Sequence, residues 1–349
     1  MSTWLFSTDW RKSRLLILCY HGVSLDDEHL WDPSMHLSPE VFRSRLKCLR
    51  DNQCAILPLA EGVDRLYKGT LPPRSVVLTF DDGFHDFHAA AWPILKEFSA
   101  PATVYQTTYY SEFNRPVFDP MCSYLVWKSP SSRLDWPEVT GAAIQLPEGR
   151  AKAVAAIKSY CLREKLSARD KDLLLLELAG RLGVEMETLL RRRILHLMNA
   201  KEIREIAAAG IDVQLHTHRH VAPSRNEALW AEVDENREHI ERLTGRTATH
   251  FCYPSGIVRP GVPELLRQRG VVTGTTARAG LASRTSDPLL LRRVFDTCSM
   301  TEVEFEGWLT GVECFLPRRP LAQSSRYDDL FAGQQDERCL DRLCRVDPT

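Results

Sequence analysis

Two short stretches of this chain carry side chains that bind metals, and each follows an apolar run. The letters TFDDG place Asp81 and Asp82 side by side, and the letters HTHRH place His216 and His220 four positions apart. Carboxylate and imidazole groups together suit a divalent cation. If one aspartate and both histidines bind the cation, the second carboxylate is spare. The pattern therefore indicates catalysis as well as metal binding.

A plain turn is the alternative for the first stretch, because Asp-Asp-Gly tripeptides commonly form Asx-type turns. The histidine pair, which follows in a compatible order, favours the metal site. His218 lies between the two histidines of that pair. We interpret it as a solvated loop residue, with a place at the rim of a substrate groove as the alternative.

Short apolar runs alternate with helical patterns along the chain, which is typical of a parallel sheet wrapped by helices. The predicted strands are 15–20, 76–80, 102–106, 211–215, 250–253 and 271–275. The predicted helices are 39–52, 87–98, 199–209, 224–243 and 260–269. Both metal-binding stretches directly follow a predicted strand, so each site residue stands where a strand gives way to a loop.

The interval from about 112 to 196 interrupts this alternation. It contains an irregular, aromatic-rich part and then helical candidates at 149–164, 168–182 and 186–193. Leucines within the second of these helices form an apolar face, so we expect the insertion to pack onto the main domain as a cap. The polar residues 318–349 are expected to form a loosely attached tail.

Composition excludes several classes of function. The 349 residues are 44% hydrophobic and can bury a large core, and 45 basic and 46 acidic residues leave a net charge of −1. That balance gives no reason to expect nucleic acid or an anionic membrane as a partner. The ten cysteines lack any C-x-x-C pair and are read as mostly reduced thiols.

The N-terminal region contains a basic segment and then the apolar run 15–20, which together imitate a signal peptide. The apolar run is too short for that role, and a buried first strand is the better interpretation. No other stretch approaches the length of a membrane span. We therefore expect a cytoplasmic location.

The two metal-binding stretches resemble the first two motifs of the polysaccharide deacetylase family, which has the NodB homology domain. The letters LCYHGV at 18–23 resemble the opening strand of one branch, as in poly-N-acetylglucosamine deacetylases, and FCYPSG at 251–256 resembles the third motif. The resemblance implies an α/β fold, a distorted (β/α) barrel of the NodB type over residues 13–317, with the largely helical insertion at 112–196.

The resemblance also implies roles for the residues of these motifs. Asp82, His216 and His220 would hold the cation, and Asp81 would be the general base. A turn permitted by Gly83 would let the two carboxylates point to different sides of the attacking water. Zinc suits this ligand set, and cobalt, nickel and manganese also match.

The third motif departs from the family pattern, because Cys252 stands where an arginine commonly holds the catalytic aspartate. A thiol cannot supply that charge, so either another residue orients Asp81 or its pKa is tuned differently. By resemblance, Ser255 would help hold the developing oxyanion through its backbone N–H, with Tyr253 beside it at the substrate. A strand-ending turn without a catalytic donor is the alternative.

The proton donor is a second departure. Many relatives carry a histidine near the end of the domain, but in this chain no histidine follows His250. The branch with the N-terminal histidine implies His21 as the donor, and the alternative is a structural histidine that caps the first strand. His85 and His88 are expected at the surface or just outside the site. We interpret the pair Arg292 and Arg293 (RR) as structural or as lining the rim.

These features predict a metal-dependent hydrolase that removes N-acetyl groups from an amino-sugar oligosaccharide or polysaccharide, or from its lipid-linked precursor. The expected partner is a carbohydrate bearing N-acetyl groups, as in exopolysaccharide biosynthesis. One alternative is hydrolysis of a non-sugar amide at the same metal site. Another is a non-catalytic carbohydrate-binding protein, against which the spare carboxylate of Asp81 argues.

Overall fold

The computed structural model describes residues 9–316, so the predicted tail at 318–349 lies outside the described residues. Seven parallel strands close into a barrel, because the first strand pairs with both the last strand and β5. In order around the barrel these are β1 (Arg14–Tyr20), β13 (Leu291–Phe295), β11 (Thr273–Ala279), β10 (His250–Cys252), β9 (Asp212–Leu215), β6 (Thr103–Gln106) and β5 (Ser75–Phe80). The predicted (β/α) barrel is confirmed.

Continuous apolar runs explain why the strands form the centre of the domain. The letters LLILCY of β1 and SVVLTF of β5 are buried at every position, as expected for parallel strands covered on both faces. All six predicted strands are present within two residues at their starts. Two short strands extend the sheet, β4 (Ala55–Ile56) beside β5 and the antiparallel β12 (Ala282–Ser283) beside β1.

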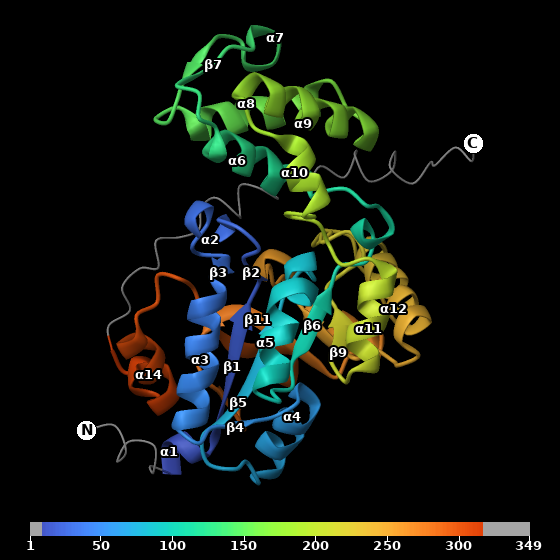
Figure 1. The fold of residues 1–349 in the computed structure, drawn as a ribbon. Coiled ribbons are helices and arrows are strands. Elements are labelled where there is room, and N and C mark those ends of the chain that lie inside the picture. The colour runs from blue at the N-terminus through green and yellow to red at the C-terminus, as the bar shows by residue number, and fades with distance from the viewer. Residues whose placement is uncertain (1–8, 317–349) are drawn as a thin grey trace.

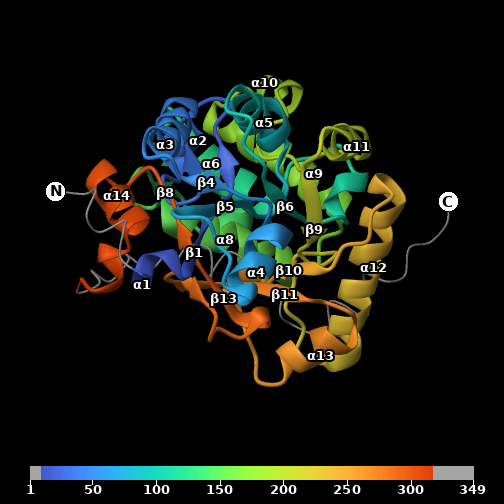
Figure 2. The same cartoon turned by 90° about the horizontal axis from the view of Figure 1, so that it is seen from below.

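Helices surround the strands, as the view along the barrel shows (Figure 2). They are α3 (Pro39–Asp51), α4 (Leu59–Lys68), α5 (Trp92–Glu97), α11 (Ala200–Ala208), α12 (Asn226–Thr244), α13 (Val262–Gln268) and α14 (Glu302–Thr310). The predicted helix 87–98 is in fact a π-helical turn, η2 (Phe87–Ala91), followed by α5. Pro93 lacks the N–H that a regular helix needs there, which explains the change of hydrogen-bond pattern.

The insertion forms a helical cap above the carboxyl ends of the strands (Figure 1). It comprises α6 (Phe118–Lys128), β7 (Arg133–Leu134), α7 (Pro137–Thr140), β8 (Ile144–Gln145), α8 (Arg150–Arg163), α9 (Ala168–Leu182) and α10 (Met186–Arg191). Leu125, Ile157 and Leu178 are fully buried in a core of its own. Helix α6 was expected to be irregular. It is apolar nearly all round, so it shows no helical periodicity in the sequence.

A short connection near the end of β1 ties the cap to the barrel. After β2 (Gly22–Val23), the chain forms α2 (Glu28–Trp31) and β3 (His36–Leu37). Trp31 packs within the cap core, with its ring 5.5 Å from that of Tyr124. Lys128 Nζ lies 2.7 Å from Asp27 Oδ2. The loop that follows His21 is therefore held against the cap.

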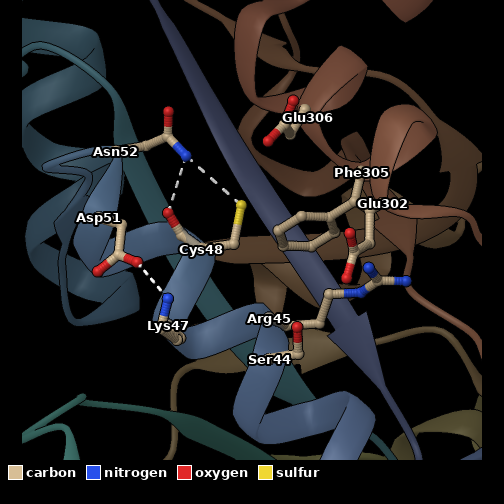
Figure 3. Close-up of a pocket in the computed structure, with 9 residues that line it drawn as sticks. All are labelled: Ser44, Arg45, Lys47, Cys48, Asp51, Asn52, Glu302, Phe305 and Glu306. Atoms are coloured by element: carbon tan, nitrogen blue, oxygen red, sulfur yellow. Dashed lines mark hydrogen bonds and ion pairs between the residues drawn. The ribbon is translucent and has the colours of Figure 1, made fainter.

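A pocket of about 220 Å³ lies between α3 and α14 on the flank of the barrel (Figure 3). Its lining mixes both signs of charge, and several of its polar groups pair with each other. Lys47 Nζ lies 2.8 Å from Asp51 Oδ2, and Asn52 donates to the Cys48 carbonyl at 2.9 Å.

Among the described residues, none of the helices combines the length and the apolar character needed to cross a bilayer.

Candidate active site

The ends of β5 and β9 bring the predicted metal ligands together. Asp82 Oδ1 lies 3.1 Å from Nε2 of His216 and 3.1 Å from Nε2 of His220. The ligand atoms of all three residues lie within 4.8 Å of one another, and all three side chains are buried. The two histidines that HTHRH places four positions apart therefore face one carboxylate.

Left-handed backbone conformations make this convergence possible. Asp82, Thr217, His220 and Ser255 all have positive φ angles, between 54° and 68°, although none of them is glycine. Each such residue costs about 1–3 kcal/mol, and such strain persists where the surrounding structure enforces it, often at functional sites. The turns at the strand ends are therefore shaped for the site at the expense of local stability.

The donor set fits a divalent cation. His216 Nδ1 lies 3.0 Å from the carbonyl oxygen of Cys252, which can accept its proton, so Nε2, which faces Asp82, is the nitrogen that would bind the cation. Burial opposes ionisation of Asp82, but the two histidines hold its pKa well below the ordinary value. One carboxylate oxygen and two imidazole nitrogens match zinc and similar metals and leave further coordination positions open.

Helix α12 holds the HTHRH turn in place. The buried Asn236 side chain accepts a hydrogen bond from the His216 backbone N–H at 2.9 Å and donates to Gln106 O at 2.9 Å. The Glu232 carboxylate accepts from the backbone N–H of Arg219 at 2.7 Å. The position of the metal-binding turn thus depends on side chains that the motif does not contain.

Replacing Asn236 with alanine is expected to weaken zinc binding about 10–100-fold, because the His216 backbone loses the bond that orients it. Competition between the protein and a chelator of known affinity would measure the change. Asn226→Ala is the matched control, since Asn226 is an exposed residue at the start of the same helix. Equal zinc affinity for both variants would contradict the positioning role of Asn236.

His218 is not the solvated loop residue that we expected from the sequence. Its side chain is buried, with Nδ1 2.9 Å from Thr108 Oγ1, and its ring packs against Tyr109 and His239. Burial lowers the pKa of His218 to about 3, so the imidazole is neutral near neutral pH. The expectation fails because the left-handed Thr217 turns position 218 towards α12 and not towards solvent.

Arg293 supplies the charge that the third motif lacks. Its Nη1 lies 2.7 Å from Asp81 Oδ1 and its Nη2 lies 2.7 Å from Asp81 Oδ2, which is a bidentate ion pair between two buried side chains. Its Nη2 also lies 3.1 Å from Cys252 Sγ. The rim-lining alternative for Arg293 is therefore wrong, because the buried side chain contacts the expected catalytic carboxylate directly.

The same ion pair determines the ionisation of Asp81. Burial by itself would raise the pKa of this carboxyl, but the charge and hydrogen bonds of Arg293 hold it well below 3.8, its ordinary value. Two thiols also approach Oδ2, Cys252 at 3.3 Å and Cys19 at 3.5 Å. Asp81 is therefore a carboxylate at neutral pH, adjacent in sequence to the ligand Asp82.

His21 lies on the same edge of the barrel as these residues. Its Nε2 is 3.9 Å from Asp81 Oδ2, and its ring stacks on Phe295 with centroids 5.6 Å apart. Burial lowers the pKa of His21, while the charges of Asp81 and Asp82 oppose that shift. The structure thus brings the expected proton donor next to the expected base.

The third motif separates into two parts. Ser255 lies in the turn η4 (Pro254–Gly256) directly after β10, at the edge where the metal ligands lie. Tyr253 does not face the site. Its hydroxyl donates to Leu289 O at 2.9 Å, and its ring packs on Phe251 in the hydrophobic core between the strands and the surrounding helices. The expected substrate contact of the Tyr253 side chain is corrected accordingly.

Gly83 shapes the turn that separates the two aspartates. Its φ is +79°, and a Cβ atom there would come within 2.1 Å of Gln106 Oε1. Gly83→Ala is expected to lower the free energy of unfolding by about 2–4 kcal/mol, because a left-handed alanine and a steric clash both add cost. Denaturant unfolding would measure it.

Gly141 gives the control for that substitution, since its φ is +76° but a Cβ atom added there would have no neighbour within 4 Å. Gly141→Ala should lower the free energy of unfolding only by the cost of a left-handed alanine backbone, about 1–2 kcal/mol. An equal loss in both variants would mean that the Gln106 contact costs nothing.

The chain matches the polysaccharide deacetylase family model over residues 68–127 and 182–274, which include Asp81 and the three predicted metal ligands. Poly-β-1,6-N-acetyl-D-glucosamine N-deacetylase of Escherichia coli is 30% identical over 95 residues, which is 27% of this chain and 14% of that protein. The chain spans about a third or less of the length of the curated relatives it matches.

Two solved structures share the fold. The Streptococcus pyogenes deacetylase PplD in complex with acetate aligns with a TM-score of 0.57 and 18% identity, covering 85% of this chain and 98% of that one. IcaB from Ammonifex degensii aligns with a TM-score of 0.54 and 19% identity, covering 85% and 97%. At these identities the likeness concerns the fold alone. The parallel barrel, the motifs at its strand ends and the family match together lead to one conclusion: the family that this chain matches in sequence and fold is the polysaccharide deacetylase family.

Proposed function

We propose that this protein is a metal-dependent hydrolase that removes N-acetyl groups from an amino-sugar oligosaccharide or polysaccharide, or from its lipid-linked precursor. The observation that carries the proposal is the ionised Asp81 carboxylate, which Arg293 holds beside a complete set of three metal ligands. A protein that only binds carbohydrate has no need of a spare base next to a metal centre. The name of the Escherichia coli relative supports an N-acetylated sugar as the substrate.

Hydrolysis of an acetamide needs an activated water, a polarised carbonyl and a proton for the departing amine. Asp82, His216 and His220 would hold the cation, which supplies polarisation of the carbonyl and acidification of water when bound. Asp81 takes a proton from the attacking water. As the C–N bond breaks, His21, which enters this step as the imidazolium, gives a proton to the amine, and acetate leaves with the water oxygen. The proton on Asp81 then passes to solvent, and His21 takes a proton back from it.

Ser255 completes the proposed site as a backbone donor. Its place in the turn after β10, at the barrel edge of the predicted ligands, supports this role, in which its N–H would donate to the carbonyl oxygen as negative charge develops there. Zinc is the proposed native metal, because two imidazoles and one carboxylate form a common zinc ligand set, and cobalt, nickel and manganese remain alternatives. The expected cytoplasmic location stays a prediction, which fractionation of the source cells would check.

The test is acetate release from N-acetylglucosamine oligomers by protein that has been stripped with a chelator and reconstituted with zinc. We expect release by the reconstituted protein and none by the stripped protein. Parallel reactions with N-acetylglucosamine and with N-acetylated amino acids separate substrate classes. Release from the amino acids alone would replace the carbohydrate with a small amide. No release from any compound, with zinc still bound, would leave a carbohydrate-binding protein.

A further inference from the structure

A second group of metal-binding side chains lies on the flank of the barrel. His85 and His88 belong to the segment that leads from the TFDDG turn into η2, and Glu202 and Glu205 lie on α11, which faces it. His85 Nδ1 is 3.0 Å from Glu202 Oε1, and His88 Nε2 is 2.8 Å from Glu205 Oε2. Two histidine–glutamate pairs therefore connect the same two segments.

The donor atoms of this group converge. Those of His85, His88 and Glu202 lie within 4.8 Å of one another. The two imidazole rings are nearly parallel, with 19° between their planes and centroids 6.3 Å apart. Both the histidines and the glutamates are spaced three positions apart, so each pair lies on one face of its helical segment. The His88 and Glu205 side chains are 22% and 42% exposed, which gives an ion a path from solvent.

Arg193 occupies part of this group in the structure. Its guanidinium contacts the Glu202 carboxylate, and its Nη1 lies 3.0 Å from His85 Nδ1. Arginine has no acceptor, so the Glu202 carboxylate accepts from this positive group, and so does His85 Nδ1 in the tautomer that leaves this nitrogen unprotonated. A divalent cation can take that position, because Arg193 keeps a second bond through Nη2 to Leu197 O at 2.8 Å.

We propose that His85, His88 and Glu202 form a second, non-catalytic site for a divalent cation of the zinc type, with Glu205 beside them as the partner of His88. Two imidazoles and one carboxylate match an ion of this type, and Glu205, through its pair with His88, adds a second negative charge nearby. The ion would join η2 to α11. Because the His85 backbone N–H donates to His196 O at 2.8 Å and the Met198 N–H donates to Gly83 O at 2.9 Å, it would brace the turn that carries Asp81 and Asp82.

The test counts zinc in the full chain by mass spectrometry of the metal, after incubation with excess zinc sulfate and removal of unbound ions. We expect about two zinc ions per chain in the wild type and about one in H88A/E205Q. H216A should also retain about one, held at the flank site. These counts do not depend on acetate release, so the failure of either proposal is distinguishable from that of the other.

Two further variants make the result specific. Arg193→Gln removes the competing positive charge and is expected to lower the Kd for the second zinc about tenfold. His239→Ala is the matched control, because the His239–Glu112 pair, at 2.7 Å, belongs to no convergent group of three donors among the described residues, and this variant should retain both ions. One zinc in the wild type, or two in H88A/E205Q, would overturn the proposal. If H88A/E205Q fails to fold by circular dichroism, unchanged zinc affinity in Arg193→Gln overturns it instead.

Discussion

Replacing Asp81 with asparagine is expected to lower kcat for acetate release about 10²–10⁴-fold, the usual contribution of a general base. Asparagine has nearly the same size but cannot accept the proton of the attacking water. The ligands Asp82, His216 and His220 are unchanged, so zinc content at the catalytic centre should match that of the wild type. Steady-state kinetics combined with a metal count would measure both effects.

A second carboxylate on the barrel provides the control for this prediction. Asp212 begins β9, at the end of the strand away from His216, and accepts a hydrogen bond from Thr103 Oγ1 at 3.2 Å. Asp212→Asn should therefore leave kcat near that of the wild type. Equal activity of Asp81→Asn and the wild type would remove Asp81 from the role of base. Loss of zinc by Asp81→Asn would instead make it a ligand.

Replacing Arg293 with glutamine is expected to have the second-largest effect. The substitution leaves a buried carboxylate without its ion-pair partner, which costs about 3–5 kcal/mol of unfolding free energy. It should also lower kcat/KM, because Asp81 loses the two bonds that fix its position. Denaturant unfolding and acetate release would measure the two losses. Arg293→Lys keeps the charge but not the planar fork, so it should fall between the wild type and the glutamine variant.

The neighbouring arginine makes an unusually close control. Arg292 stands next to Arg293 on β13 but is exposed, so Arg292→Gln should change the unfolding free energy by about 0.5 kcal/mol or less. The double variant D81N/R293Q should be more stable than R293Q, because it no longer buries an unpaired charge. If the double variant lost as much unfolding free energy as the two single variants together, Asp81 and Arg293 would not be coupled.

The pH dependence of the glutamine variant follows from the same ion pair. Burial raises the pKa of Asp81 and Arg293 lowers it, so removing the arginine moves this pKa upward. The base acts in its ionised form, so activity rises with pH through its pKa. The acidic limb of the kcat/KM profile should therefore move to higher pH in Arg293→Gln. An unchanged limb would mean that Arg293 supports only the fold.

The pH dependence of the unfolding free energy gives an independent check on the effect of Arg293 on the pKa of Asp81. In the wild type the folded pKa of Asp81 lies below 3.8, its ordinary value. The ion pair therefore contributes its full stabilisation above that pH, and this contribution is lost as the pH falls through the folded pKa. The difference in unfolding free energy between the wild type and Arg293→Gln should be largest near neutral pH and shrink in strong acid.

Local sequence was enough to locate the barrel strands and to predict which three side chains converge at the candidate metal site. Strands buried on both faces read as continuous apolar runs, so their positions follow from local composition. The ligands follow because each group lies within a few residues of a strand end, and carboxyl ends of parallel strands meet at one edge of the barrel. Asp82, His216 and His220 converge for that reason.

Contacts between distant parts of the chain select the side chains that complete the site. Arg293 lies 212 residues from Asp81 in the chain, and the adjacent Arg292 has the same side chain but faces solvent. Only the closure of β13 against β1 settles which arginine enters the barrel. Tyr253 and His218 were misplaced for a similar reason, because a hydrogen bond to Leu289 and a left-handed turn set their directions. Side-chain direction depends on long-range pairing and backbone strain, and neither leaves a periodic signal in the sequence.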